Sequence, residues 1–163
     1  MSTRPGLRVA LLAVAVATIG CDRLTKHAAT AVLAGAPGRS YLADTIRLEY
    51  AENTGGFLSL GAQAPHGVRT LLFTIGTGFM LLALVRAAVG LRWRGWRLLG
   101  VGLVVAGGVS NWVDRIVHGS VVDFINVGIG PLRTGIFNVA DVAIMLGAGT
   151  LVFSASVSKE RQP

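Results

Sequence analysis

Residues 107–141, GGVSNWVDRIVHGSVVDFINVGIGPLRTGIFNVAD, place three aspartates between two apolar stretches, and this arrangement dominates the sequence. The aspartates are Asp114, Asp123 and Asp141. The flanking residues 98–110 and 142–157 contain no charged side chain. A carboxylate between such apolar runs is costly unless it is paired, neutralised or used for a function. The stretch therefore predicts apolar helices that carry acidic groups for a purpose.

The composition is that of an integral membrane protein. The chain has 163 residues, which predicts one domain covering residues 1–163. It is 52% apolar and 14% charged, against about 25% charged residues in soluble domains. Its mean hydropathy is +0.62. The net charge of +7 would suit nucleic acid, but no stripe of Lys and Arg interleaved with aromatic residues is present, so no nucleic-acid partner is expected.

Four apolar runs predict an all-α membrane protein with four transmembrane helices, over about residues 8–28, 68–90, 97–114 and 136–157. A helix needs ~20 residues to cross a bilayer. The first run also resembles a secretory signal, and residues 18–21, Thr-Ile-Gly-Cys, resemble a lipoprotein cleavage box. Three further apolar runs follow instead of a soluble domain, so we expect the first run to be retained. Asp22 and Lys26 are one helical turn apart and are expected to pair at the membrane boundary.

The region of about residues 40–62 predicts a small β-sheet on the membrane surface. Residues 46–50, Ile-Arg-Leu-Glu-Tyr, alternate apolar and polar side chains, as a half-buried strand does. Residues 53–56, Asn-Thr-Gly-Gly, predict a turn, and residues 57–61 follow as a further short apolar segment. Residues 116–135 are polar and glycine-rich, and are expected to form an outer loop that carries part of the site.

The distribution of charge predicts the topology. Four spans put both termini on one side of the membrane, and the basic turn at residues 92–97 favours the cytoplasm for that side. Seven of the eight acidic residues, all except Glu160, then fall on the outer half. We therefore expect the carboxylate site to face the extracytoplasmic side.

The aspartates favour acid–base chemistry. Two carboxylates in one apolar pocket share a proton, so the ionised group can activate water while the protonated group polarises a carbonyl. Asp114 is expected to pair with the adjacent Arg115. Asn111 and Asn138 each stand three residues before an aspartate and are expected to donate their side-chain amides to it. Spacing alone leaves all three aspartates in contention.

Other catalytic and cofactor classes lack their sequence patterns. The motifs G-x-S-x-G, H-E-x-x-H and the P-loop do not occur. The three histidines have no metal-ligand spacing, and Cys21, the single cysteine, lies in an apolar run. We expect neither a metal ion nor another cofactor.

Five motifs resemble, in order, those of signal peptidase II, the lipoprotein signal peptidase of bacteria. They are Asp22-Arg23-Leu24-Thr25-Lys26, Asn53-Thr54-Gly55-Gly56, Gly107-Gly108-x-x-Asn111-x-x-Asp114-Arg115, Val121-Val122-Asp123-Phe124 and Phe137-Asn138-x-Ala140-Asp141. The resemblance implies a membrane aspartic endopeptidase that removes the signal peptide of prolipoproteins just before a diacylglyceryl-modified cysteine. It also implies residence in the bacterial cytoplasmic (inner) membrane, contact with membrane lipid and inhibition by globomycin-type peptides.

The resemblance also implies roles for individual residues. Asp123 and Asp141 would be the catalytic pair. Residues that would shape the pocket, hold the substrate or support the site are Asn53, Asn111, Asp114, Arg115, Asn138, Asp22 and Lys26. The sheet would match the family's β-cradle. Residues 55–60, Gly-Gly-Phe-Leu-Ser-Leu, depart from the family's usual pattern of a small-residue pair, Phe and then Ser or Gly, which leaves the lining of the cradle open.

Two other classes compete with the peptidase. One is a small proton-coupled transporter in which Asp141 relays protons, and the other is a non-catalytic membrane assembly factor whose acids join helices. Both predict that Asp123 tolerates replacement by asparagine. The peptidase predicts that asparagine at either Asp123 or Asp141 abolishes cleavage.

Overall fold

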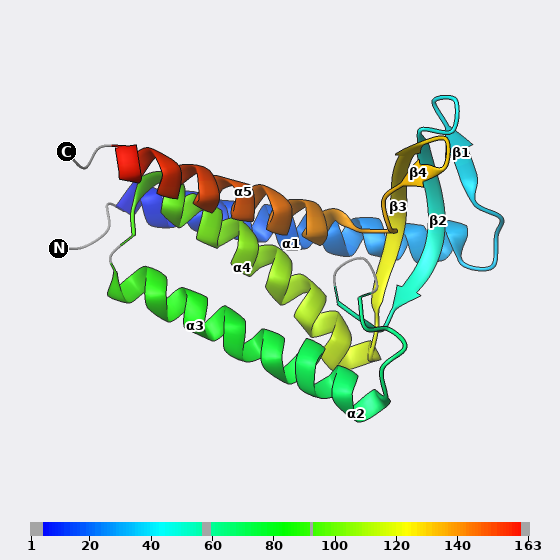
Figure 1. Ribbon diagram of the computed structural model, residues 1–163, viewed down its shortest axis with the longest axis horizontal. Helices are drawn as coiled ribbons and strands as arrows, with labels where there is room; N and C mark the ends of the chain where they lie inside the picture. The colour runs from blue at the N-terminus through cyan, green and yellow to red at the C-terminus, as the bar shows by residue number, and fades with distance from the viewer. Residues whose placement is uncertain (1–4, 57–59, 92, 161–163) are drawn as a thin grey trace.

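The computed structural model describes residues 5–56, 60–91 and 93–160, as a bundle of long helices with a small sheet at one end (Figure 1). The helices are α1 (Pro5–Leu33), α2 (His66–Arg69), α3 (Thr77–Gly90), α4 (Gly95–His118) and α5 (Val139–Glu160). A π-helical segment, η2 (Thr70–Gly76), joins α2 to α3. The strands are β1 (Arg39–Tyr41), β2 (Ile46–Asn53), β3 (Val121–Ile129) and β4 (Leu132–Arg133). The start of α1 and the end of α5 lie together at the end of the bundle remote from the sheet.

Three stretches of the described residues are helical, long and apolar enough to cross a membrane: His66–Gly90, Gly95–His118 and Val139–Ser156. They correspond to the predicted spans at 68–90, 97–114 and 136–157. The 29-residue α1 is not among the candidate spans found in the described residues. The chain is therefore a largely helical, multi-pass membrane protein with three clear candidate spans.

The sheet is antiparallel, with strand order β1-β2-β3-β4. Its β2 confirms the strand predicted from the alternation at residues 46–50. The expectation of a loop throughout residues 116–135 was wrong, because β3 pairs with β2 along its length. Most of the first half of β3 is buried on both faces, so its sequence shows no polar alternation that would predict a strand. The predicted segment at residues 57–61 falls partly outside the described residues, and residues 60–61 form a turn.

The pairing of β2 with β3 brings two candidate site residues, Asn53 and Asp123, close together. Ala51 lies opposite Asp123 and Asn53 lies opposite Val121, so the end of β2 runs beside the aspartate of β3. Strand side chains alternate between faces, so Asn53 and Ala51 project to the same side of the sheet as each other. This register therefore places the turn that begins at Asn53 close to Asp123.

Helix α4 is the centre of the bundle and packs against α1, α3 and α5. Glycine residues allow α4 and α5 to approach each other closely. A Cβ on Gly107 would lie 2.4 Å from the Ala140 carbonyl oxygen, and a Cβ on Gly147 would lie 2.6 Å from the Gly100 carbonyl oxygen. This agrees with the use of small residues where lipid provides no hydrophobic drive for helices to associate.

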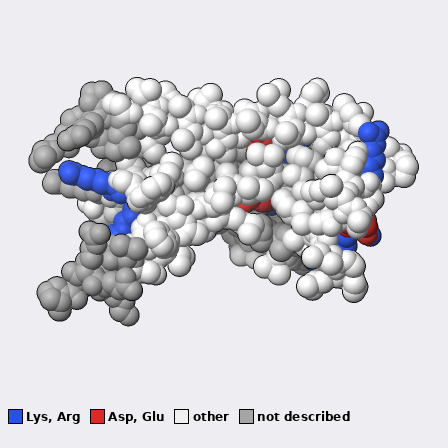
Figure 2. Space-filling view, turned by 90° about the horizontal axis from the view of Figure 1, so that it is seen from above, with Lys and Arg blue, Asp and Glu red and all other residues white. Residues whose placement is uncertain are grey.

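The surface is apolar where a soluble protein would be polar. Large hydrophobic side chains are exposed along the outward faces of α1, α3 and α5, among them Leu12, Phe79 and Phe153. Figure 2 shows basic side chains near the two ends of the molecule and few charges on the visible surface between them. A contiguous exposed apolar surface of this kind fits a lipid environment.

Candidate active site

Two carboxylates from different elements meet at one asparagine. The side-chain amide of Asn138 donates to Asp123 Oδ1 at 2.7 Å, and its backbone N–H donates to Asp141 Oδ2 at 3.1 Å. All three residues are buried, with exposed fractions of 0% for Asn138, 1% for Asp123 and 7% for Asp141. The structure thus brings together the aspartate of β3 and the aspartate of the first turn of α5.

Asn138 can serve both carboxylates because it caps α5. Its Oδ1 accepts the backbone N–H of Asp141 at 2.9 Å, while the Asp141 carboxylate accepts the backbone N–H of Asn138. This reciprocal pattern is a capping box. The prediction that the Asn138 side-chain amide donates to Asp141 was therefore wrong. Asn138 lies just before the helix rather than one turn earlier within it, and that amide is free to turn toward Asp123.

Asn53 holds the other oxygen of Asp123. Its Nδ2 donates to Asp123 Oδ2 at 2.9 Å and to the Gly56 carbonyl at 2.9 Å, while its Oδ1 accepts the Gly55 backbone N–H at 2.9 Å. Asn53 therefore makes the turn predicted at residues 53–56 and contacts the aspartate at the same time.

Burial sets the protonation of Asp123. It raises the pKa of this carboxyl to about 6, and the nearby Asp141 carboxylate acts in the same direction. The amide hydrogen bonds from Asn53 and Asn138 oppose the shift, because they stabilise the ionised form. A carboxyl with this pKa exchanges its proton close to neutral pH, as general acid–base catalysis requires.

Asn111 of α4 holds the second oxygen of Asp141. Its Nδ2 donates to Asp141 Oδ1 at 2.9 Å, and its Oδ1 accepts from Lys26 Nζ at 2.7 Å and from Asn138 Nδ2 at 3.2 Å. The expected contact between Asn111 and Asp114 is not the one that forms. Because its Oδ1 accepts from the Lys26 ammonium and from the Asn138 amide, Asn111 must turn its own amide nitrogen toward Asp141.

Lys26 is the shared cation of a buried network. Its Nζ lies 2.7 Å from Asp22 Oδ2 and 2.7 Å from Asp114 Oδ2. The pairing of Asp22 with Lys26 across one turn of α1 was predicted correctly. Asp114 also pairs with Arg23, and its predicted partner Arg115 was wrong. Consecutive residues on a helix point in different directions, so Asp114 faces α1 while Arg115 does not.

Arg115 contacts the Asn53 turn instead. Its Nη2 and Nε donate to the Gly55 carbonyl at 2.6 and 3.2 Å, and its Nη1 donates to the Asn111 carbonyl at 3.3 Å. A planar guanidinium can bind one acceptor through two nitrogens, which fixes direction as well as distance. Arg115 thereby ties α4 to the turn that carries Asn53.

Polar donors rather than metal ligands surround the two carboxylates. Each oxygen of Asp123 and Asp141 accepts an N–H from an asparagine. Within residues 5–56, 60–91 and 93–160, no group of three or more His, Cys, Asp and Glu side chains is arranged to hold a metal ion. Two buried carboxylates held by amide donors can take part in proton transfer.

Comparison with known proteins identifies the family. The model of the family described as signal peptidase (SPase) II matches residues 14–157. The chain belongs to the signal peptidase II family. A lipoprotein signal peptidase of Rhodococcus jostii is 34% identical, with 94% of this chain and 75% of the relative covered. One of Gloeobacter violaceus is 31% identical, with 91% and 83% covered.

Solved structures share the fold of this signal peptidase II family member. A bacterial membrane enzyme determined by the in meso method at 2.3 Å resolution has a TM-score of 0.81 at 22% identity, and covers 94% of this chain and 92% of that one. A second, determined at 1.9 Å resolution, has a TM-score of 0.73 at 23% identity, covering 90% and 92%. The protein is therefore a protease of the signal peptidase II type with the fold of a known bacterial membrane enzyme.

Sequence reasoning missed two contacts of this signal peptidase II site. Ser110 donates its hydroxyl to Asp22 Oδ2 at 2.7 Å, and Arg23 donates to the Ser110 carbonyl at 3.1 Å. Ser110 stands one turn before Asp114 on α4, and that spacing places both on the face toward α1. This spacing was the available signal, but it identifies the α1 partners only once the two helices are known to pack together.

Proposed function

We propose that the protein cleaves the signal peptide from diacylglyceryl-modified prolipoproteins just before the lipidated cysteine, with Asp123 and Asp141 as its catalytic pair. The convergence of both carboxylates on Asn138 carries this proposal. The substrate class is supported by the relatives, which are named lipoprotein signal peptidases.

The proposed reaction is a direct attack of water on the scissile carbonyl. The ionised carboxylate of the pair removes a proton from the water, while the protonated one donates a hydrogen bond to the carbonyl oxygen. The tetrahedral intermediate then collapses as a proton passes to the leaving amine. The raised pKa of Asp123 supports proton sharing near neutral pH, and the two groups titrate as a pair.

The surrounding side chains are proposed to hold this pair and the substrate backbone in place. Asn53 and Asn138 orient Asp123, and Asn111 and Asn138 orient Asp141. Behind them, Lys26 fixes Asn111, while Asp22 accepts the Ala140 backbone N–H at 2.9 Å and so supports the start of α5. Arg115 sets the Asn53 turn, and Asp114 helps to neutralise Lys26.

The membrane arrangement is also a proposal. One domain, residues 1–163, would cross the bacterial inner membrane four times, with α1 as the additional span over about residues 8–28. The pairing of Asp22 with Lys26 supports this, because mutual neutralisation lowers the cost of charges in a span. Both termini would be cytoplasmic, and the sheet would form an extracytoplasmic cradle beside the carboxylates. Membrane lipid would surround the helices, and globomycin-type peptides would block the site.

The decisive experiment follows the mobility shift of a diacylglyceryl-modified prolipoprotein incubated with purified protein in lipid. Wild type, Asp123→Asn, Asp141→Asn and Asp114→Asn are compared, with Asp44→Asn in the exposed β1–β2 turn as the matched control. We expect cleavage by wild type and by the control, and none by the variants at 123 and 141. Each variant must match wild type in its elution by size-exclusion chromatography.

Each other outcome contradicts a defined part of the proposal. Cleavage by Asp123→Asn together with inactivity of Asp114→Asn would show that the pair is wrongly assigned. A folded wild type that leaves the modified substrate intact would refute the peptidase. Survival of function in Asp123→Asn is also what a proton-coupled transporter or an assembly factor predicts.

A further inference from the structure

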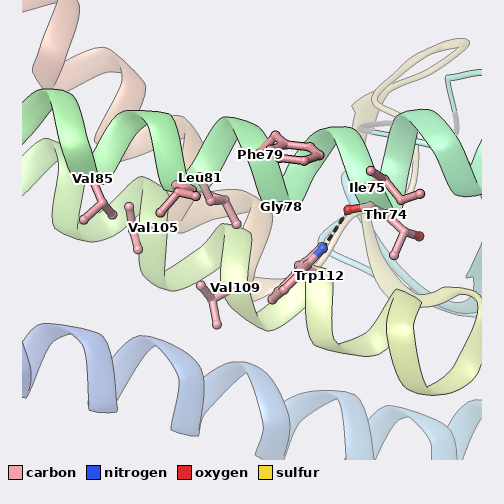
Figure 3. A pocket seen from close by; sticks show the side chains of 10 residues that line it. Thr74, Ile75, Gly78, Phe79, Leu81, Val85, Val105, Val109 and Trp112 are labelled. Carbon is pink, nitrogen blue, oxygen red and sulfur yellow. Dashed lines mark hydrogen bonds between the residues drawn. The ribbon is translucent and has the colours of Figure 1, made fainter.

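An apolar cavity of about 620 Å³ lies between α4 and the continuous helix formed by η2 and α3 (Figure 3). On α4 it is lined by Val105, Val109 and Trp112, which share one face of that helix. Leu81 and Val85 of α3 line the opposite wall. The catalytic candidates do not line it, since α4 presents Asn111 to α5 on another face. This cavity is a feature separate from the carboxylate site.

A second pocket of about 360 Å³ continues the cavity toward the sheet end of the bundle. Thr74 lines both, which places the two side by side. The charged side chains around this second pocket are Arg69 and Arg115, with His66 nearby, and no described acidic residue lines it. The two pockets together form a groove, hereafter the α3–α4 groove, that is apolar at one end and basic at the other.

Arg69 brings a positive charge to this basic pocket. Its Nη1 donates to Thr54 Oγ1 at 2.5 Å and to the Ala62 carbonyl at 3.4 Å. Its Nε is buried and has no hydrogen-bond partner among the described residues. The hydrogen bonds that Arg69 makes among the described residues go to neutral acceptors, so its positive charge is available to an anionic ligand in the pocket.

The change from apolar to basic occurs where a membrane boundary is expected. The span His66–Gly90 begins beside the basic pocket, and α4 ends there at His118. Trp112 lines the apolar cavity, and its Nε1 donates to the carbonyl of Thr74, the residue that lines both pockets, at 2.7 Å (Figure 3). Tryptophan prefers this interfacial level, and π-helical segments such as η2 often occur at functional sites.

We propose that the α3–α4 groove binds one anionic membrane phospholipid. Its phosphate contacts Arg69 and Arg115, and one acyl chain lies between α3 and α4. Charge complementarity selects this occupant, because an ionised phosphate accepts charge-assisted hydrogen bonds that an uncharged glyceryl headgroup does not. The diacylglyceryl group of a prolipoprotein carries no such charge. The inference requires membrane insertion but is independent of which aspartates are catalytic.

Bound phospholipid would also act on the candidate active site. Arg115 reaches both the basic pocket and the Gly55 carbonyl of the Asn53 turn. A phosphate on Arg115 would restrain this guanidinium and, through it, the turn that contacts Asp123. The lipid is therefore a positioning ligand that stabilises the protein.

Lipid retention by the full-length protein tests the proposal. Native mass spectrometry in detergent compares phosphatidylglycerol, phosphatidylcholine and diacylglycerol with identical acyl chains. We expect one phosphatidylglycerol to be retained, about tenfold more tightly than the other two lipids. Arg69→Gln should weaken its retention about tenfold, whereas Arg39→Gln, an exposed arginine of β1 outside the groove, should leave it unchanged. Equal retention of the three lipids, or equal effects of the two arginine variants, would overturn the proposal.

Filling the apolar cavity provides an independent test. Val105→Trp places a large side chain in the cavity and should abolish retention, whereas Val89→Trp on the exposed surface of α3 should not. Phosphatidylglycerol with a photoreactive acyl chain can also be crosslinked to the unmodified protein, which avoids any folding defect. Crosslinks concentrated at residues 78–85 and 105–112 are expected. Crosslinks spread evenly over α1 and α5 would refute the site.

Discussion

Replacing Asn138 by serine separates two functions of this residue. Serine retains an oxygen that caps α5, because serine and asparagine are similarly good N-caps. It removes the amide that donates to Asp123 Oδ1 at 2.7 Å. A hydrogen bond to an ionised group contributes about 1.5–3 kcal/mol, which corresponds to about 1–2 pKa units. Since the lost bond stabilises the ionised form, the pKa of Asp123 should rise from about 6 toward about 7–8.

The pH dependence of kcat/KM for prolipoprotein cleavage measures this shift. The pair needs one protonated and one ionised carboxylate, and the Asp141 carboxylate helps to raise the pKa of Asp123, so Asp123 is the protonated member and activity is lost as pH rises through its pKa. We expect the alkaline limb to lie near pH 6 in wild type and about 1–2 pH units higher in Asn138→Ser. Asn53→Ser removes the donor to the other oxygen and should shift the limb in the same direction.

Asn126→Ser is the matched control. Asn126 of β3 is likewise a buried asparagine, but its side chain contacts Thr134 and Arg133 rather than either carboxylate. The alkaline limb of its pH profile should coincide with that of wild type. A folded Asn138→Ser enzyme whose limb stays near pH 6, or moves to lower pH, would refute the assignment of Asp123 as a titrating member of the pair.

Three further predictions concern the scaffold of the site. Lys26→Met leaves the buried carboxylates of Asp22 and Asp114 without their shared cation. It should lower the free energy of unfolding by about 3–5 kcal/mol, measured by SDS titration in mixed micelles. A loss of less than about 1 kcal/mol would contradict the importance of this ion-pair network. Gly107→Ala should lower the free energy of unfolding by about 1–3 kcal/mol in the same assay, because the added Cβ would lie 2.4 Å from a backbone oxygen of α5. Gly149→Ala is the control, since a Cβ at Gly149 would have no atom within 4 Å. Arg115→Lys keeps the charge but loses the two-nitrogen contact to Gly55, and should reduce kcat/KM about tenfold with little change in stability; full activity would argue against Arg115 as a positioning residue.

Features that depend on short-range spacing were predictable from the sequence. Three of the four apolar runs became candidate spans, and the alternation at residues 46–50 became β2. The pairing of Asp22 with Lys26 follows from their separation by one helical turn. Five motifs in order, from residue 22 to residue 141, also suggested the family, which the family match then confirmed.

Several predictions that assigned partners from nearness in sequence failed. Asp114 pairs with Lys26 and Arg23 of α1 rather than with its neighbour Arg115. Asn111 donates to Asp141 rather than to Asp114. Adjacent side chains on a helix diverge, and a polar group buried between helices takes the partner that faces it.

The sequence by itself determined that this is a membrane protein, where its apolar helices lie and which acidic motifs it carries, because these depend on composition and on spacing within single elements. Only the tertiary structure decided which amide serves which carboxylate. Asn138 reaches Asp123 because the residue before it, Phe137, forms a β-bridge with Ile125 of β3. Lys26 reaches Asn111 because α1 packs on α4. Such contacts join residues far apart in the chain, so their geometry follows from how the helices and the sheet pack together.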